Sequence, residues 1–254
     1  MIIKSRSNQK IKQLKKLVRS KKERDLSELF VAEGDKVVRD IAYNFEPVEI
    51  FCTEKYAQKN EFSVSLTLVE ESVLNSVSDL DNVQNVIAVF KKPKWELKDI
   101  LNAEKFTVIL GDRLQDPANI GVIIRSCYCL GADALILTEG SVDLYSPKIV
   151  RASSSYISKL PVFNISLNEV LEIKKEASFF VASASETEIG VELKQLDKIP
   201  EKAVFVFGNE GQGLNPDLID KSDTMFTIGM RQEAESLNVS VAVAVTLYTI
   251  NKIL

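Results

Sequence analysis

The second half of the chain alternates short buried strands with helices in a regular order. The apolar periodicity predicts a strand at residues 106–110, a helix at about 119–130 and another strand at 134–138. Further strands are predicted at residues 179–183, 203–207 and 225–228, with helical segments between them. Strands that alternate with helices form a mainly parallel sheet whose two faces are covered. The sequence therefore predicts an α/β domain that ends in a long apolar segment at 237–254, whose length favours a buried helix.

The first half repeats this alternation on a smaller scale. An amphipathic helix from residue 8 to about 22 is predicted by four apolar residues at helical spacing, Ile11, Leu14, Leu17 and Val18. A second helix is predicted at residues 35–43, and short strands at 48–52, 66–69 and 86–90. A charged stretch with a proline follows at 91–94, which is typical of a linker. We expect a basic N-terminal arm at 1–24, a small α/β domain at 25–98 and a larger domain at 99–254.

Composition places the chain among soluble globular proteins. Of its 254 residues, 45% are hydrophobic and 27% are charged. No apolar run reaches the roughly 18 residues that a membrane helix needs, and the N-terminus lacks the apolar stretch of a signal peptide. The three cysteines, Cys52, Cys127 and Cys129, are interpreted as reduced, small buried residues because their spacing fits no metal site. We expect a cytoplasmic protein that does not contact a membrane.

The chain contains no histidine. This absence excludes triads based on histidine and zinc sites with histidine ligands. Catalysis must then use other side chains, and we expect no metal.

Charge is distributed unevenly along the chain. The net charge is −4, yet residues 1–24 hold ten cations against one acid, Glu23, for a local charge of +9. A phosphate-binding arm on an acidic body has this pattern, although a solvated surface helix has it too. The candidate RNA-binding residues are Arg6, Lys10, Lys12, Lys15, Lys16 and Arg19.

Three loops that follow predicted strands are candidate ligand sites, because ligands bind at the carboxyl ends of parallel strands. The first, residues 111–121, leads into a helix with Arg125 among apolar residues; Asn119 would alternatively be a helix cap. The second, 207–214, has three glycines, which suit close backbone approach to a ligand or a plain tight turn. Its Glu210 would repel a phosphate, so a neutral or cationic ligand fits better. The third, 228–240, carries Ser236 and Asn238, which would alternatively cap the last helix.

Together these loops resemble the three motifs of the SpoU, or TrmH-like, family of RNA ribose 2′-O-methyltransferases. The matching segments are Asp-Pro-Ala-Asn-Ile-Gly at 116–121 with Arg125, Phe-Gly-Asn-Glu-Gly-Gln-Gly at 207–213 and Glu-Ser-Leu-Asn-Val-Ser at 235–240. Residues 145–153 also resemble a family segment, and residues 30–34 and 84–89 resemble the family's small substrate-binding module. Order and spacing agree throughout, which is more specific than any single motif.

The resemblance implies a deep trefoil knot in the α/β domain, a homodimer with its active site near the subunit interface, and S-adenosylmethionine as cofactor. The residues that match the family's polar catalytic positions are Asn119, Arg125, Glu210, Ser236 and Asn238. Those expected to contact the cofactor, largely through the backbone, are Gly208, Gly213, Ile228, Met230 and Leu237. The chain departs from the family pattern at Gly229, where proline is usual, and at Gln232 and Ser155, where glycine is usual.

The implied reaction is an in-line methyl transfer from a sulfonium to a ribose 2′-hydroxyl, which requires alignment of donor and acceptor and removal of one proton. Arg125 would activate the hydroxyl, either as base or electrostatically through the adjacent phosphate. We expect structured RNA as substrate, with ribosomal RNA favoured over transfer RNA. The alternatives are a catalytically inactive RNA-binding relative, and a dinucleotide-dependent oxidoreductase suggested by the glycine cluster.

Overall fold

The computed structural model describes residues 2–60, 62, 64–78, 85–183, 190–209, 211–231 and 233–251. The chain forms two compact units. The first contains Met1–Lys94 together with Asp143–Ser158, and the second contains Trp95–Val142 with Lys159–Leu254. The chain therefore passes between the units three times.

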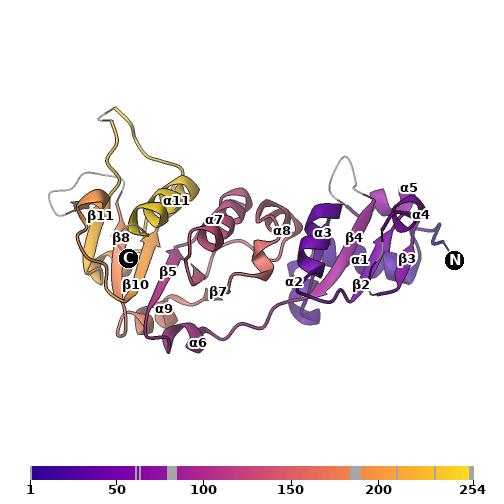
Figure 1. Ribbon diagram of the computed structural model, residues 1–254, viewed down its shortest axis with the longest axis horizontal. Helices are drawn as coiled ribbons and strands as arrows, with labels where there is room; N and C mark the ends of the chain where they lie inside the picture. Colours follow the sequence, from indigo (N-terminus) through magenta and orange to yellow (C-terminus); the bar gives the residue numbers. More distant parts are fainter. Residues whose placement is uncertain are drawn as a thin grey trace. The chain divides into compact units, whose positions relative to one another are not determined.

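Over the residues that the structure describes, the first unit is a four-stranded mixed sheet with short helices (Figure 1). Its helices are α1 (Gln9–Arg19), α2 (Lys21–Ser27), α3 (Asp35–Ala42), α4 (Glu54–Ala57), α5 (Glu71–Asn75), α8 (Pro147–Ala152) and the 3₁₀ turn η1 (Tyr156–Ser158). Its strands are β1 (Leu29–Glu33), β2 (Glu49–Cys52), β3 (Leu66–Leu68) and β4 (Val86–Lys91). In the order β1-β4-β2-β3, strand β4 is antiparallel to both its neighbours, whereas β2 and β3 are parallel.

Helix α1 is an integral part of this unit. Asn8 caps it by accepting a hydrogen bond from the backbone of Lys10, at 2.9 Å. Its four apolar residues are buried in one cluster with residues of β1, β2 and β4, including Val31, Phe51 and Ile87. Burial of four aliphatic side chains contributes roughly 1.5–3 kcal/mol each to stability. The basic residues are left on the opposite, solvent-facing side.

The stretch Asp143–Ser158 joins the first unit through both apolar and charged contacts. The rings of Phe30 in β1 and Tyr145 lie 5.4 Å apart. Arg24 pairs with Asp143, and Arg151 Nη1 donates to Glu33 Oε2 at 2.7 Å. The sequence analysis divides the chain at residue 98 and so puts this stretch in the larger domain. In the structure the stretch belongs to the first compact unit, because its long-range contacts are with residues of that unit.

The second unit is built on a seven-stranded parallel sheet in the order β7-β6-β5-β10-β8-β11-β9, counted over the described residues. The strands are β5 (Phe106–Gly111), β6 (Ala134–Thr138), β7 (Val162–Ile165), β8 (Ser178–Ala182), β9 (Val191–Glu192), β10 (Lys202–Phe207) and β11 (Thr224–Thr227). The helices are α6 (Leu97–Leu101), α7 (Pro117–Cys129), α9 (Leu167–Ile173), α10 (Pro216–Asp220), α11 (Val239–Ile250) and the 3₁₀ turn η2 (Leu193–Gln195). The predicted α/β architecture is confirmed.

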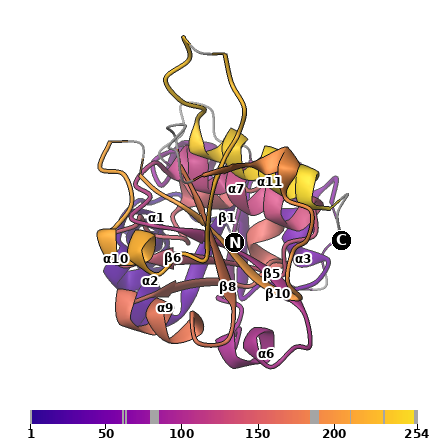
Figure 2. The ribbon, with the colours of Figure 1, turned by 90° about the vertical axis from the view of Figure 1, so that its left-hand side faces the viewer.

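Helices cover both faces of this sheet (Figures 1 and 2). Helices α7 and α11 pack side by side on one face, and Asn251 at the end of α11 donates to the carbonyl of Leu130 at the end of α7. Helices α9 and α10 pack against the core residues of the other face, among them Val108 and Val206. Over the described ranges, no helix combines the length and the apolar character that crossing a bilayer requires.

Two cap assignments from the sequence change. Helix α7 starts at Pro117, and its cap is Asp116, which accepts from the backbone of Ala118. Asn119 lies inside the first turn, so it is not the cap. Helix α11 starts at Val239 with Asn238 as its cap, so of the two proposed caps Ser236 is wrong and Asn238 is right.

Candidate active site

A pocket of about 320 Å³ opens at the carboxyl ends of β8, β10 and β11 in the second unit. The lining residues come from these strand ends, from the loops that follow them and from the start of α11. They are Val181, Ala182, Ser183, Phe207, Gly208, Asn209, Gly213, Leu214, Ile219, Met225, Phe226, Ile228, Met230, Ser236, Leu237, Val239 and Ala242. A cavity of this size and position is typical of a small-molecule site in an α/β fold.

All five residues that the sequence suggested for cofactor contact lie on this one pocket. They are Gly208, Gly213, Ile228, Met230 and Leu237, which come from two separate loops. At Gly208 a Cβ would meet the carbonyl carbon of Gly213 at 2.9 Å, so no side chain fits there. Gly213 itself has φ 65°, a conformation that glycine adopts without steric cost. The glycines thus let backbone form the pocket wall.

The pocket lining is mostly apolar and includes a few polar groups. Ser183, Asn209 and Ser236 supply the polar side chains, and the described lining residues include no lysine, arginine or carboxylate. A dinucleotide pyrophosphate would meet no cation here, which counts against the oxidoreductase alternative. An apolar or zwitterionic ligand that uses backbone hydrogen bonds matches this lining better.

The structure brings two of the predicted catalytic residues into direct contact next to the pocket. Asn238 Nδ2 donates to Asn119 Oδ1 at 2.9 Å, which joins the start of α11 to the first turn of α7. The Asn238 Oδ1 atom accepts from Ser240, both from its backbone at 2.9 Å and from its hydroxyl at 2.6 Å. Ser236, two residues earlier, lines the pocket. The contact between the two asparagines therefore fixes the position of Asn238, which stands between the lining residues Leu237 and Val239.

Arg125 lies apart from this group. Its side chain is exposed on α7 and does not line the pocket. Val122 and Tyr128 stand three residues before and after it, so at helical spacing all three share one exposed face. Glu210, the remaining predicted catalytic residue, lies outside the described residues.

Cysteines and metal-ligand clusters offer no alternative chemistry among the residues that the structure describes. Burial raises the pKa of Cys52 to about 11 and also raises the pKa of Cys127, so both thiols remain protonated at neutral pH. Cys129 is exposed, so the interpretation of all three cysteines as buried was wrong for this one, since it faces solvent near the end of α7. No group of three or more potential metal ligands occurs in the described ranges.

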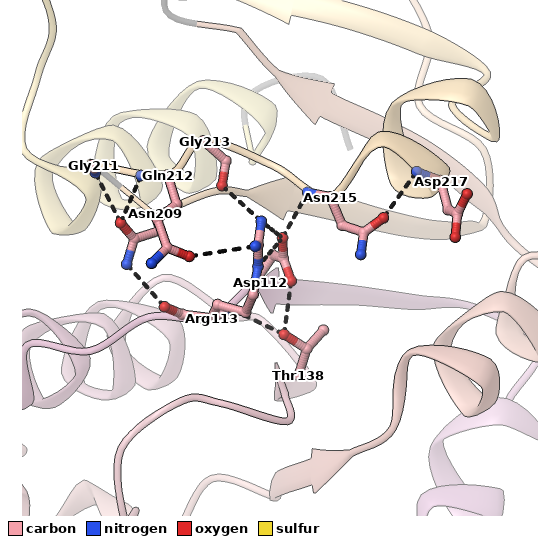
Figure 3. A network of polar contacts seen from close by, with 9 residues as sticks. All are labelled: Asp112, Arg113, Thr138, Asn209, Gly211, Gln212, Gly213, Asn215 and Asp217. Carbon is pink, nitrogen blue, oxygen red and sulfur yellow. Dashed lines mark hydrogen bonds and ion pairs between the residues drawn. The ribbon is translucent and has the colours of Figure 1, made fainter.

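The sequence analysis did not identify one polar network, which Figure 3 shows. Asp112 directly follows β5 and is 1% exposed, and it lies beside Arg113 and Thr138. Asn209 Nδ2 donates to the carbonyl of Arg113 at 2.9 Å, which connects this network to the pocket wall. The signal that could have found it is an aspartate immediately after a buried, mostly apolar strand, because a buried carboxylate requires several donors.

The candidate RNA-binding residues lie in the first unit, on or next to α1. Arg6, Lys10, Lys12, Lys16 and Arg19 are exposed, and Lys15 is half-buried. Lys10 forms an ion pair with Glu49. Arg24, one of the ten cations counted in the basic segment, is buried against Asp143 and is therefore not available to a phosphate.

The structure gives a local account of two of the three departures from the family pattern. A Cβ at Gly229 would lie 2.3 Å from the Oε1 atom of Glu192, so the Glu192 side chain would have to move to admit one. Ser155 has φ 71° and Ser154 has φ 49°, which explains why glycine suits this turn. Gln232 lies outside the described residues.

Comparison with known proteins identifies both parts of the chain. A model of the SpoU rRNA methylase family matches residues 105–248, and a model of the MRM3-like substrate binding domain matches residues 8–88. The 23S rRNA (guanosine(2553)-2′-O)-methyltransferase of Bacillus subtilis is 29% identical over 97% of this chain and 97% of its own length. A 23S rRNA (adenosine(1067)-2′-O)-methyltransferase of Streptomyces azureus is 23% identical over 86% of this chain and 84% of its own.

Solved structures agree over the full chain. An AdoMet-bound rRNA methyltransferase from Sinorhizobium meliloti has a TM-score of 0.86 at 26% identity, covering 99% of this chain and 97% of that one. The SpoU methyltransferase AviRb from Streptomyces viridochromogenes shares the fold, with a TM-score of 0.85 at 23% identity over 96% and 97% of the two chains. The motifs, the fold and the family match agree, and the chain belongs to the SpoU rRNA methylase family.

Proposed function

We propose that this protein transfers a methyl group from S-adenosylmethionine to a ribose 2′-hydroxyl of ribosomal RNA. The observation that carries the proposal is the pocket at the ends of β8, β10 and β11, on which all five expected cofactor residues converge. The relatives named above are 23S ribosomal RNA 2′-O-methyltransferases, which favours the large-subunit RNA as substrate over transfer RNA.

The residues of the pocket fit the cofactor. The backbone at Gly208, Ile228 and Leu237 would hold the adenosine part by main-chain hydrogen bonds, while apolar side chains would enclose the base. The absence of charged side chains from the described lining suits a ligand that carries its own positive sulfonium. When bound, the cofactor supplies an activated methyl group, and no metal is needed. We further propose the trefoil knot of the family, in which the segment before α11 passes through a loop.

On the acceptor side, the chain's own residues must position the ribose and help remove its proton. The Asn119–Asn238 contact fixes two amides at the pocket edge, where they are suited to orient the ribose. Ser236 lies beside them on the lining. Glu210 keeps its sequence-based assignment as a residue that orients Arg125 or the ribose. We assign to Arg125 the activation of the 2′-hydroxyl, through an adjacent phosphate or as base.

The position of Arg125 supports a homodimer. Because its side chain is exposed on α7 and does not line the pocket, it would reach a ribose most simply across a subunit interface. The faces of α7 and α11 expose four large apolar side chains, Val122, Tyr128, Val241 and Tyr248, each 43–58% accessible. Apolar groups gathered on two packed helices are typical of an interface. We therefore propose that a second copy covers this surface and completes the site.

The first unit is the proposed RNA-binding part. The exposed cations of α1 would contact phosphates, and the match to a substrate-binding domain model covers this helix. The cytoplasmic location expected from the sequence is compatible with a ribosomal RNA substrate. The alternatives are a transfer RNA substrate and an inactive RNA-binding relative.

Two measurements test the proposal. Calorimetry with S-adenosylmethionine should show binding to the purified protein, whereas an inactive relative with a decayed site should release no heat. Mapping of ribose methylation in total RNA from cells with and without the protein should then reveal one 2′-O-methyl group that depends on it. A site in transfer RNA would replace the ribosomal assignment, and no lost methyl group despite cofactor binding would contradict the proposal.

A further inference from the structure

We infer that Asp112, Arg113 and Thr138, none of which lines the pocket, are positioning residues that hold the cofactor wall in its binding shape. The inference rests on the proposed function and names residues beyond the family motifs used above. The wall in question consists of the described residues of the loop between β10 and α10, of which Gly208, Asn209, Gly213 and Leu214 belong to the lining.

Asp112 connects the ends of two strands and the end of the glycine loop through one buried carboxylate. It follows β5, and its Oδ1 accepts from Thr138 Oγ1 at the end of β6 at 2.8 Å. Its Oδ2 accepts from the backbone nitrogen of Asn215, at the far end of the glycine loop, at 2.8 Å. The same oxygen accepts from Arg113 Nη2 at 3.1 Å. A carboxylate at 1% exposure needs these donors, so its burial favours the loop position that supplies one of them.

Arg113 fastens the middle of the same loop. Its Nη2 donates to the carbonyl of Gly213 at 3.3 Å and its Nη1 to Gln212 Oε1 at 3.4 Å. Figure 3 shows the guanidinium between Asp112 and the loop. These two contacts are long for charge-assisted hydrogen bonds. The ion pair with Asp112 nevertheless fixes the guanidinium in place, so that it can donate to both loop residues at once.

The start of the loop is fixed by a third connection. Asn209 Nδ2 donates to the carbonyl of Arg113 at 2.9 Å, while its Oδ1 accepts from the backbone of Gly211 at 2.8 Å and of Gln212 at 3.0 Å. Arg113 presents that carbonyl from a left-handed conformation, with φ 51°, and its backbone nitrogen donates to Thr138 Oγ1 at 2.9 Å. Thr138 therefore orients both Asp112 and Arg113.

The loop is thus tied at its start, middle and end to one polar group behind the pocket. A glycine-rich loop would otherwise sample many conformations, and ordering it on binding would reduce cofactor affinity. The network orders the loop before the cofactor binds, so binding does not have to supply the free energy of ordering it.

The test compares cofactor affinity in variants that leave the pocket lining unchanged. Arg113→Gly removes the guanidinium while keeping the backbone conformation accessible, and we expect it to weaken S-adenosylmethionine binding about tenfold in calorimetry. Glu28→Gly is the matched control, because it makes the same kind of change at a left-handed residue, φ 55°, in the first unit. Its cofactor affinity should equal that of the wild type.

Two substitutions of Thr138 provide a second, independent test. Thr138→Val removes the hydroxyl at nearly constant volume, and Thr138→Ser restores it. We expect Thr138→Val to raise the KM for S-adenosylmethionine several-fold with the KM for RNA unchanged, and Thr138→Ser to restore the wild-type value. Equal cofactor affinity in Arg113→Gly and wild type would overturn the inference, as would parallel losses in both KM values without rescue by serine. A wild-type protein that binds no cofactor would instead contradict the proposed function.

Discussion

Glu28, Arg113, Ser154 and Ser155 adopt left-handed backbone conformations, with φ between 49° and 71°. For a residue with a Cβ, this conformation costs roughly 1–2 kcal/mol relative to the right-handed region. Glu28 stands at the end of α2, where its backbone nitrogen donates to the carbonyl of Arg24. Arg113 belongs to the network behind the pocket, whereas Glu28 is a plain helix end.

Glu28→Gly should therefore stabilise the protein. Glycine is the preferred residue at a left-handed helix end, and we expect the free energy of unfolding to rise by about 0.5–1 kcal/mol, measured by urea denaturation. Glu28→Ala is the control, because it removes the carboxylate but keeps the Cβ. If alanine stabilised as much as glycine, the gain would come from charge and the backbone explanation would be wrong.

Arg125→Ala should abolish methyl transfer while leaving the dissociation constant for S-adenosylmethionine within about twofold of wild type, a difference of less than 0.5 kcal/mol. The reason is that Arg125 is exposed on α7 and the pocket does not include it. The measurements are single-turnover transfer to RNA and cofactor calorimetry. Near-normal turnover would remove Arg125 from the chemistry.

If each active site is shared between two subunits, mixed dimers provide a second test of Arg125. When Arg125→Ala is co-expressed with a pocket variant, Leu237→Arg, each mixed dimer should contain one complete site, and about a quarter of wild-type activity should return. Each variant alone should be inactive. No recovery from dimers shown to be mixed would mean that Arg125 acts within its own subunit.

At the scale of elements, α1 has two faces with separate tasks. One buries Ile11, Leu14, Leu17 and Val18 in the core of the first unit, and the other exposes lysines. Deleting residues 1–24 would therefore remove core residues as well as charged ones. If such a deletion lost RNA binding, the loss could come from unfolding of the first unit or from the missing lysines. Substitutions confined to the exposed face do separate them.

Lys12→Gln with Lys16→Gln should weaken RNA binding and flatten its salt dependence. The two lysines are exposed one helical turn apart, and loss of two phosphate contacts should reduce the slope of log K against log salt by about 1.5. Lys98→Gln with Lys175→Gln, at exposed lysines of the second unit, is the control. An unchanged slope in the α1 variant would show that this face is only solvated.

Several elements were predictable because local sequence determines them. The strands β5, β6 and β10 are mostly apolar and buried, and they lie where the periodicity predicted. Strands β7 and β9 were not predicted, since β7 mixes exposed and buried residues and β9 has only two residues. The cap of α7 was assigned to Asn119, whereas the observed helix start makes Asp116 the cap, because a local pattern does not fix where a helix begins.

The candidate site was predictable in part for a similar reason. Motif resemblance selected Gly208 and Leu237, which meet on one pocket although 29 positions separate them in the chain. It did not select Asp112 or Thr138, because their role arises from strand order: β5 lies between β6 and β10 in the sheet. Neighbours in a sheet are set by long-range packing, which a local pattern does not encode.

At the scale of the whole molecule, the two units interleave along the chain. Asp143–Ser158 belongs to the first unit and buries Ile149, Val150 and Ile157, yet residues on both sides of it belong to the second. Its partners within the first unit include Arg24, Phe30 and Glu33, given above with their contacts. Neither unit is therefore a continuous segment.

A fragment that begins at Trp95 should leave this stretch without partners. We expect trypsin to cleave it rapidly after Lys148 and Arg151 in the fragment but slowly in the full chain, because α8 loses the sheet on which it packs. Cleavage after the exposed Lys175 should proceed at the same rate in both proteins. Protection of Lys148 and Arg151 in the fragment would show that the stretch folds without the first unit.

The three passages of the chain between the units also limit how such a protein can evolve. Recombination at a single breakpoint near Lys94 would exchange only part of the first unit and would leave Asp143–Ser158 facing a surface to which it is not matched. A gene fusion that replaced the first unit would succeed only if both of its segments were inherited together. Divergence in this lineage should therefore proceed through paired substitutions, such as at Arg151 and Glu33, rather than by domain shuffling.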